Sequence, residues 1–519
     1  MTMGTTVRDG LELVNAMAVK LNSVKLDFYV KDRADGPYGI VEVAAPAERF
    51  FRVLKEAQGG ISEDNLFKER ATISRRASAP TNRLSLPETQ LFKATLSESL
   101  TVDRYTFSDN FFGRYIRSVF GFEDQVVSAA NYLIYGRRGA GKSSLLAYAM
   151  HRCKQQGLPY AWVDMQVYAD RDDAKVAIDV VSEVLDQLSK FGEQSNEFRS
   201  LKSGLAECAG MDDTSADRAL MRLLPRLKSY FSAIVDLKGN VSVFIDDLHV
   251  VSAAMQPQIL ARLYSITRGN RSYLKISGIE QFTRPWDSKK NIGLQAPNDA
   301  QVLKLDYNLT MPDKSRDHIA SILDAHARFC GLPDSAYISG EGVLSRLVWV
   351  AAAVPRDALN LFAQAITKAS AQGQRRVSIT SVNAAASEMA EQKLRDMQQD
   401  AHGQEERVQA VLGEIRKFCV TDKRKNAFLL EIKNEDAAFR FIQELIALRF
   451  VHVLHEGITP HEAGRRYQAL MLDYGFYVGI RAARSVDLFQ KDPKTPTVQE
   501  LRKLPIFTPG AQINSIVDD

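Results

Sequence analysis

The sequence is poor in cysteine: four of its 519 residues are cysteines, and they form no CxxC pair. Spacing this wide excludes a disulfide scaffold and is typical of buried thiols in a reducing compartment. Long apolar runs are also lacking, because the longest one, at 347–354, is far too short to span a bilayer. The first ten residues lack the charged-then-apolar pattern of a signal peptide. We therefore expect a cytoplasmic protein without a membrane partner.

An excess of one charge is missing too, since 67 Lys and Arg residues against 63 Asp and Glu residues leave a net charge of +4. This balance excludes a global basic field as a sign of nucleic-acid binding, although a local basic face is compatible with it. Hydrophobic residues make up 45% and charged residues 25%, which is an ordinary globular composition. At roughly 150 residues per domain, the length predicts about two to four domains.

Strand, helix and linker patterns divide the chain into six regions. We expect a small N-terminal α+β region (1–67), a Ser-, Thr-, Arg- and Pro-rich extended linker (68–105), an α/β core (106–310), an all-helical region (311–400), a winged-helix-like domain (404–490) and a loosely held tail (491–519). The winged-helix prediction depends on helices that are followed by a two-stranded element.

Five short apolar segments alternate with helical patterns in the expected core. They are NYLIYG (131–136), PYAWVDM (159–165), VSVFIDD (241–247), SYLKISGI (272–279) and QVLKLDY (301–307). Between the second and third segments, residues 174–190 place an apolar stripe on one helical face: Ile178, Val181, Val184, Leu185 and Leu188. Strands separated by helices indicate a parallel sheet with both faces covered.

A glycine-rich turn follows the first of these strands. Residues 136–143 read Gly-Arg-Arg-Gly-Ala-Gly-Lys-Ser and match G-x-x-x-x-G-K-[ST]. The glycines let successive backbone N–H groups converge on an anion, and the following helix directs its positive end to the same place. Lys142 would reach the β- and γ-phosphates, and Ser143 would place its hydroxyl on Mg²⁺. We expect the nucleotide, ATP, to be held by Gly136, Arg137, Arg138, Gly139, Ala140, Gly141, Lys142, Ser143 and Ser144.

Two adjacent acids end the third strand. Asp246 is the expected Mg²⁺ acceptor, through water, and Asp247 is placed to orient or deprotonate the attacking water. Two carboxylates at the end of a segment with four apolar residues indicate that the chain emerges there at the carboxyl edge of the sheet. Ligands bind at this edge in open α/β sheets.

Together, the turn and the acids resemble those of AAA+ ATPases, a group of P-loop NTPases with an additional strand between the two motif strands. In that group the residue after the metal-binding Asp is usually Glu, so Asp247 suggests slower hydrolysis. The resemblance implies that Ser277, in LKISGI, senses the γ-phosphate. It also implies that Arg356, in AAAVPRDALNLF, begins a helix of a lid formed by 311–400 and folds back over the nucleotide.

The order of core, helical lid and winged helix resembles the origin-recognition and initiator-loader branch of AAA+ ATPases. That branch implies a homo-oligomer in which a neighbour's arginine completes the site; Arg268, Arg271 and Arg284 are the candidates. Residues 111–117, FFGRYIR, occupy the place that lines the adenine in such proteins. The stretch from 275 to 309 also resembles uncharacterised bacterial ATP-binding proteins, many of them from mobile or defence-associated settings.

The winged-helix-like region leaves the partner open. It has 13 basic and 12 acidic residues, with basic clusters at 422–426 and at Arg465–Arg466 that could contact DNA. His452 and His455 form an HxxH pattern, but on a strand they face opposite sides, so we expect no zinc site. Three hypotheses remain: an ATP-driven motor in a nucleic-acid or multi-protein system, a slow nucleotide-gated signalling switch, and a nucleotide-stabilised scaffold.

Overall fold

The chain folds into two units, which are described separately. The structure is a computed structural model that describes residues 3–102, 109–169, 171, 173, 175–192, 195–305, 307, 309–400, 405–433, 437–459, 465–478, 486–489 and 493–509. The core unit comprises Val102–Phe112 and Arg117–Asp306, and the lid unit comprises Met1–Thr101, Gly113–Ile116 and Tyr307–Asp519. In the described part of the chain, no helix combines the length and apolar character needed to cross a membrane.

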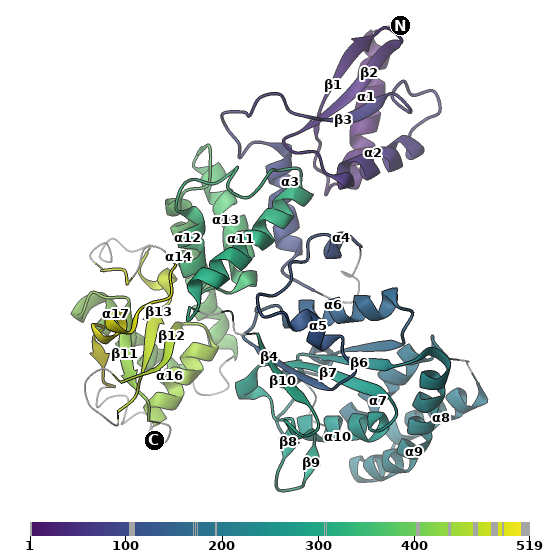
Figure 1. Ribbon diagram of the computed structural model, residues 1–519, viewed down its shortest axis with the longest axis vertical. Helices are drawn as coiled ribbons and strands as arrows, with labels where there is room; N and C mark the ends of the chain where they lie inside the picture. The colour runs from purple at the N-terminus through teal and green to yellow at the C-terminus, as the bar shows by residue number, and fades with distance from the viewer. Residues whose placement is uncertain are drawn as a thin grey trace. The chain divides into compact units, whose positions relative to one another are not determined.

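The core unit is built on a five-stranded parallel sheet (Figure 1). Its strands are β4 (Tyr132–Gly136), β5 (Tyr160–Asp164), β6 (Val241–Asp246), β7 (Ser272–Gly278) and β10 (Gln301–Leu305), in the order β10-β4-β7-β6-β5. Each coincides with one of the five apolar segments, which confirms the predicted α/β fold class. The strand β7 pairs with both β4 and β6, so it is the additional strand between the two motif strands.

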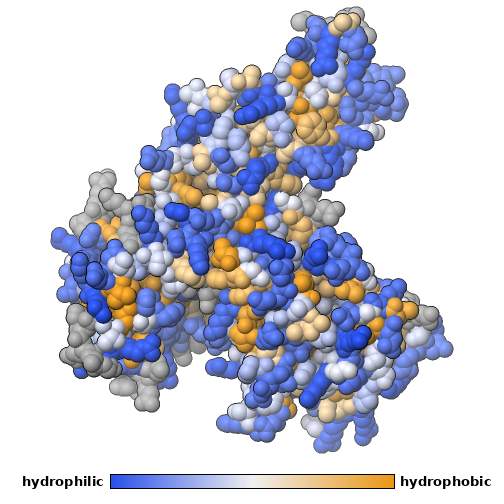
Figure 2. Space-filling view, viewed as in Figure 1, coloured by the Kyte–Doolittle hydropathy of each residue, from blue (hydrophilic) through white to orange (hydrophobic). Residues whose placement is uncertain are grey.

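Helices cover both faces of this sheet. Figure 1 shows α6 (Lys142–Gln155) on one side and α7 (Lys175–Leu188) with α10 (Gln256–Thr267) on the other. The five residues of the predicted apolar stripe on α7 are all 1% exposed or less. The chain also forms α8 (Asn196–Ala209) and α9 (Asp213–Lys238), which pack on α7, and a short hairpin of β8 (Trp286–Asp287) and β9 (Ile292–Gly293). Their apolar residues join α7 and α10 in one core, and hydrophilic residues predominate on the face of this unit that Figure 2 shows.

The N-terminal part of the lid unit is a three-stranded sheet with two helices. Its elements are α1 (Met3–Val19), β1 (Asp27–Arg33), β2 (Gly36–Val43), α2 (Glu48–Gly60) and β3 (Ala71–Arg75), with strand order β1-β2-β3. The linker predicted for 68–105 is wrong, because this segment contains β3 and the helix α3 (Pro87–Glu98). Leu91, Phe92 and Leu96 of α3 are fully buried, so packing overrides the Ser-, Thr- and Pro-rich composition.

The lid itself is helical, as expected. It contains α11 (Pro312–Phe329), α12 (Val343–Val350), α13 (Pro355–Ala371) and α14 (Ile379–Asp400). The helix α3 packs on α11 and α13, so a segment from before the core completes the bundle. Pro355 occupies the first turn of α13, where its missing N–H has no helical partner to lose.

The C-terminal part has the strand order of a winged helix. It consists of α15 (Glu405–Arg416), a π-helical turn (Lys417–Asp422), β11 (Ala427–Glu431), α16 (Ala437–Ala447), β12 (Val451–Ile458), β13 (Tyr467–Leu472), η5 (Tyr474–Phe476), α17 (Val498–Arg502) and β14 (Ile506–Phe507). The hairpin β12–β13 pairs through β13 with β11. The loosely held tail is a wrong prediction for 493–509, because β14 pairs with β11 and Phe507 packs against Phe418 and Phe428.

Candidate nucleotide-binding site

The glycine-rich turn connects the end of β4 to the start of α6. Gly141, the N-cap of α6, has φ +96°, a conformation that residues with a Cβ rarely adopt. A Cβ built on Gly141 would meet nothing within 4 Å, so the space in front of the turn is open. Gly136 is required for another reason, because a Cβ there would lie 2.8 Å from the carbonyl oxygen of Leu305 on β10. Packing against β10 therefore requires glycine at position 136, whereas the space beside Gly141 is empty.

Lys142 lies inside the turn and is only 6% exposed. Its Nζ donates to the carbonyl oxygen of Arg137 at 3.4 Å and lies 3.9 Å from Oδ1 of Asp247. Burying an ammonium group is costly unless it is paired, and here one carbonyl and one carboxylate supply the pairing. The structure therefore brings the predicted phosphate-binding lysine to the predicted catalytic acid.

Asp246 is the last residue of β6 and is 6% exposed. Burial and, secondarily, the charge of Asp247 raise the pKa of Asp246 to about 7. The hydroxyl groups of Ser277 and Ser143 hydrogen-bond to its carboxylate and act in the opposite direction on this pKa. A cation bound beside Asp246 would stabilise the charged form of this buried carboxylate.

Ser277 connects the two acids. Its Oγ donates to Oδ1 of Asp246 at 2.5 Å and accepts from the backbone N–H of Asp247 at 2.8 Å. Ser277 is fully buried on β7, directly beside β6. These two bonds tie the carboxyl end of β6 to the neighbouring strand β7, and the further sensing role of Ser277 stays a prediction.

Asp247 leaves the sheet in a left-handed conformation, with φ 55° and ψ 45°. A non-glycine residue in this region is uncommon and is often found at functional sites. The turn directs its carboxylate to Lys142 and to two groups that sequence reasoning missed. The Nε2 of Gln166 donates to Oδ2 at 3.4 Å, and Nδ1 of His249 lies 3.8 Å from Oδ1.

The two residues that sequence reasoning missed, Gln166 and His249, follow different strands. Gln166 lies in η1 (Met165–Tyr168), directly after β5, where the side chain of Asp164 accepts its backbone N–H. Its position after a buried strand was a signal in the sequence, because β5 ends at the same edge as β6. Burial lowers the pKa of His249 to about 4, so the ring is neutral beside Asp247. The sequence signal for His249 was its position two residues after Asp247.

Five predicted residues meet at the carboxyl edge of three neighbouring strands: Lys142, Ser143, Asp246, Asp247 and Ser277. The remaining expected residues of the turn (136–141 and 144) adjoin them, whereas the expected arginines lie elsewhere in the fold. Arg356 belongs to the lid unit, so its contact with nucleotide stays a prediction. Arg268 and Arg271 precede β7 and therefore lie at the opposite end of that strand, whereas Arg284 follows it. Their role as a neighbour's arginine stays a prediction, as does the adenine contact of 111–117.

The two histidines of the HxxH pattern have protein partners. His452 is buried on β12 with Nε2 3.1 Å from Asp473, and Nδ1 of His455 accepts from the backbone of Gly457. Within the described ranges, no three His, Cys, Asp or Glu side chains gather in a way that could hold a metal ion.

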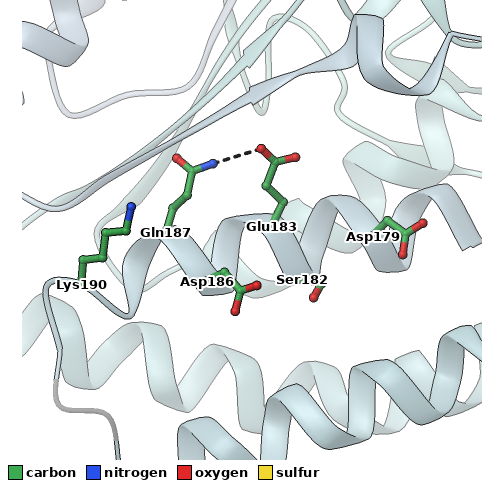
Figure 3. Close-up of a pocket in the computed structure, with 6 residues that line it drawn as sticks. All are labelled: Asp179, Ser182, Glu183, Asp186, Gln187 and Lys190. Atoms are coloured by element: carbon green, nitrogen blue, oxygen red, sulfur yellow. Dashed lines mark hydrogen bonds between the residues drawn. The ribbon is translucent and has the colours of Figure 1, made fainter. Parts of the chain in front are cut away.

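A separate pocket of about 400 Å³ lies along α7 (Figure 3). Its lining comes from α7 and from the turn that follows it: Asp179, Ser182, Glu183, Asp186, Gln187 and Lys190. Three of its acidic groups already have partners, since Asp179 pairs with Arg171, Asp186 with Lys202, and Glu183 with Gln187. We assign no ligand to this pocket, which contains none of the residues of the glycine-rich turn.

The chain is similar to several solved structures, at low sequence identity. No family model and no curated protein matches the chain. Among solved structures, it is similar to ORC1 of Aeropyrum pernix in complex with DNA, at 15% identity over 72% of this chain and 93% of that one, with a TM-score of 0.39. It is similar to Cdc6p of Pyrobaculum aerophilum at 12% identity over 74% and 98%, with a TM-score of 0.36. It is also similar to RuvB, the Holliday junction branch migration motor of Thermotoga maritima, at 11% identity over 60% and 81%, with a TM-score of 0.31.

At such scores the fold assignment depends on the chain's own geometry. The strand order β10-β4-β7-β6-β5 and the turn between β4 and α6 are the features that carry it.

Proposed function

We propose that the protein binds ATP with Mg²⁺ and hydrolyses it slowly, and that the nucleotide state controls the position of the lid. The observation that carries this proposal is the meeting of Lys142, Ser143, Asp246 and Asp247 at one edge of the parallel sheet, in front of an open glycine turn. An ammonium group, a hydroxyl and two carboxylates are the groups that phosphoryl transfer to water requires.

Each residue has a distinct role in this proposal. Backbone N–H groups of the turn and the Lys142 ammonium group bind the phosphates. Ser143 and Asp246 fit a magnesium ion, because both offer oxygen ligands and already contact each other. When bound, that ion supplies charge neutralisation at the phosphates. Asp247 accepts the proton of the attacking water, and Arg356 contacts the nucleotide from the lid.

Slow turnover is supported by the surroundings of Asp247. Its carboxylate lies near Lys142, Gln166 and His249, so it has partners other than water. Aspartate is also one methylene shorter than glutamate, so its carboxylate would lie farther from a water molecule bound beside the phosphate. Both features favour nucleotide retention over rapid hydrolysis.

The test compares Lys142→Ala with Lys154→Ala, an exposed lysine near the other end of α6. We expect Lys142→Ala to abolish ATP binding in calorimetry and phosphate release in a turnover assay. Lys154→Ala should leave both unchanged. Unaltered ATP affinity in Lys142→Ala would remove the phosphate assignment.

A second candidate is a nucleotide-gated switch that contacts a partner protein instead of DNA, and the surface of α16 favours it. This helix precedes the hairpin, the place where a winged helix reads DNA, yet among its described side chains only Arg440 is exposed. The cluster 423–425 precedes β11, whereas Arg465 and Arg466 lie beyond the end where Glu431 pairs with Tyr467. The two basic clusters are therefore at opposite ends of one strand. DNA-independent ATP turnover would favour the switch, and stimulation by DNA would favour a motor.

A further inference from the structure

Arg449 follows α16 in a conformation that normally belongs to glycine. Its φ is +66°, its backbone N–H bonds to the carbonyl of Ile446, and the N–H of Phe450 bonds to the carbonyl of Leu445. This pair of bonds is the Schellman motif, in which the residue at the position of Arg449 is usually glycine. An arginine there carries a backbone cost that glycine avoids, so its side chain should have a function.

The side chain of Arg449 pairs with the first turn of a lid helix. Its Nη1 lies 2.7 and 2.6 Å from the two carboxylate oxygens of Asp357 on α13. The side chains of Arg449 and Asp357 are only 16% and 9% exposed. Asp357 directly follows Arg356, the arginine that the proposed function assigns to the nucleotide. The guanidinium group of the winged-helix-like domain thus fixes the residue next to Arg356.

A second contact holds the same two domains together. The carboxylate of Asp473 accepts a hydrogen bond from Lys393 of α14 at 2.9 Å and lies 3.1 Å from the ring of His452. Beside it, a Cβ on Gly475 would come within 2.6 Å of the carbonyl oxygen of Ala386, so η5 lies directly against α14. The winged-helix-like domain thus contacts the lid at two separate places, α14 and the first turn of α13.

We propose that Arg449 is a positioning residue for Arg356, which makes ATP affinity depend on a residue of the winged-helix-like domain. This inference rests on the proposed function, because Arg356 must contact the nucleotide. Arg449 itself touches no nucleotide and acts through Asp357. A side chain that orients the first turn of a helix restricts the direction in which the neighbouring arginine projects.

The test is a double-mutant cycle on the full-length protein. Arg449→Gly removes the side chain and relieves the backbone cost, and Arg356→Ala removes the group that it positions. We expect Arg449→Gly alone to weaken MgATP binding about tenfold, within the range usual for coupled sites. In the Arg356→Ala background, the same change should have no further effect on the dissociation constant, because residues that act in series are not additive.

Two further variants separate positioning from stability. Arg440→Ala removes an exposed arginine from α16, the helix that Arg449 follows, and should bind MgATP like the parent. Asp357→Asn keeps the shape of the acid and should weaken binding as Arg449→Gly does, so it serves as the test if Arg449→Gly fails to fold. Thermal unfolding of each variant reports on folding independently of the nucleotide.

The outcomes distinguish the inference from the proposed function. A parent that binds no ATP would end the proposed function and the inference with it. A parent that binds ATP and an Arg449→Gly variant of equal affinity would overturn the inference alone. An equal loss from Arg449→Gly with and without Arg356 would also overturn it, because the ion pair would then affect ATP affinity independently of Arg356.

Discussion

Gly141→Ala should separate the folding of the glycine turn from its binding of phosphate. The residue has φ +96°, and a Cβ built there meets nothing within 4 Å. The protein can therefore accommodate a methyl group without a clash, but that group would stand in the space where the phosphates should lie. We expect a folded variant that no longer binds ATP.

The structure sets the size of the stability change. A left-handed residue with a Cβ costs roughly 1–2 kcal/mol, and the lower entropy of the unfolded alanine chain offsets about 0.4–1 kcal/mol of this. For a unit of this size, 1 kcal/mol shifts Tm by about 2–4 °C. Gly141→Ala should thus lower Tm by only a few degrees. In the parent, MgATP at 100 times its dissociation constant adds about 2.7 kcal/mol, a shift of roughly 5–10 °C.

Gly157→Ala is the matched control. Gly157 follows the other end of α6 with φ +67°, and a Cβ there also meets nothing within 4 Å. Both variants should show the same small loss of Tm without nucleotide in a thermal unfolding scan. With MgATP, Gly157→Ala should regain the parent's full shift and Gly141→Ala should show none. A full nucleotide shift in Gly141→Ala would refute the assignment of the open space to phosphate.

Three further predictions concern the acid pair, the basic turn and a buried histidine. Asp247→Asn should retain ATP in calorimetry while phosphate release falls about 10²- to 10⁴-fold, and a parental rate would place the base elsewhere. Replacement of Lys423, Arg424 and Lys425 by glutamate should leave ATP turnover unchanged and lower any DNA retention that the parent shows in a low-salt gel shift; unchanged retention would locate the DNA contact elsewhere. Burial, together with the charge of Arg114, lowers the pKa of His326 to about 4. As the pH falls, the unfolded chain therefore binds a proton at this histidine before the folded protein does. The free energy of unfolding should decrease between about pH 6.5 and pH 4, by up to about 3 kcal/mol. His326→Gln should flatten this part of the stability curve, and an unchanged slope would assign it to another group.

The glycine-rich turn could be predicted because all of its residues are consecutive. A strand, a glycine-rich turn and a helix form one local unit, so the sequence 132–150 contains its whole geometry. The acids were predictable for a related reason. Parallel strands end at a common edge, so Asp246 and Ser277 had to lie near the turn once β6 and β7 were recognised as strands.

The partners of Asp247 could not be predicted in the same way. Gln166 reaches it from 81 residues away, and the contact requires that β5 be the neighbour of β6. Strand order follows from packing of the whole sheet, which no single segment specifies. The error at 68–105 has a similar cause, because α3 is stabilised by burial of Leu91, Phe92 and Leu96 against distant helices.

The apolar core of the lid unit suggests how a nucleotide signal could leave the site. One hydrophobic cluster runs without interruption through the N-terminal sheet, the lid helices and the winged-helix-like domain, whereas the sheet of the core unit has a cluster of its own. The N-terminal sheet is joined to the lid by Glu88 of α3, which is fully buried, accepts from the backbone of Ala44 and pairs with Arg76. Breaking such a pair inside the protein is strongly destabilising, so the three parts should move together. A lid that follows the nucleotide would then carry the N-terminal sheet and the winged-helix-like domain with it.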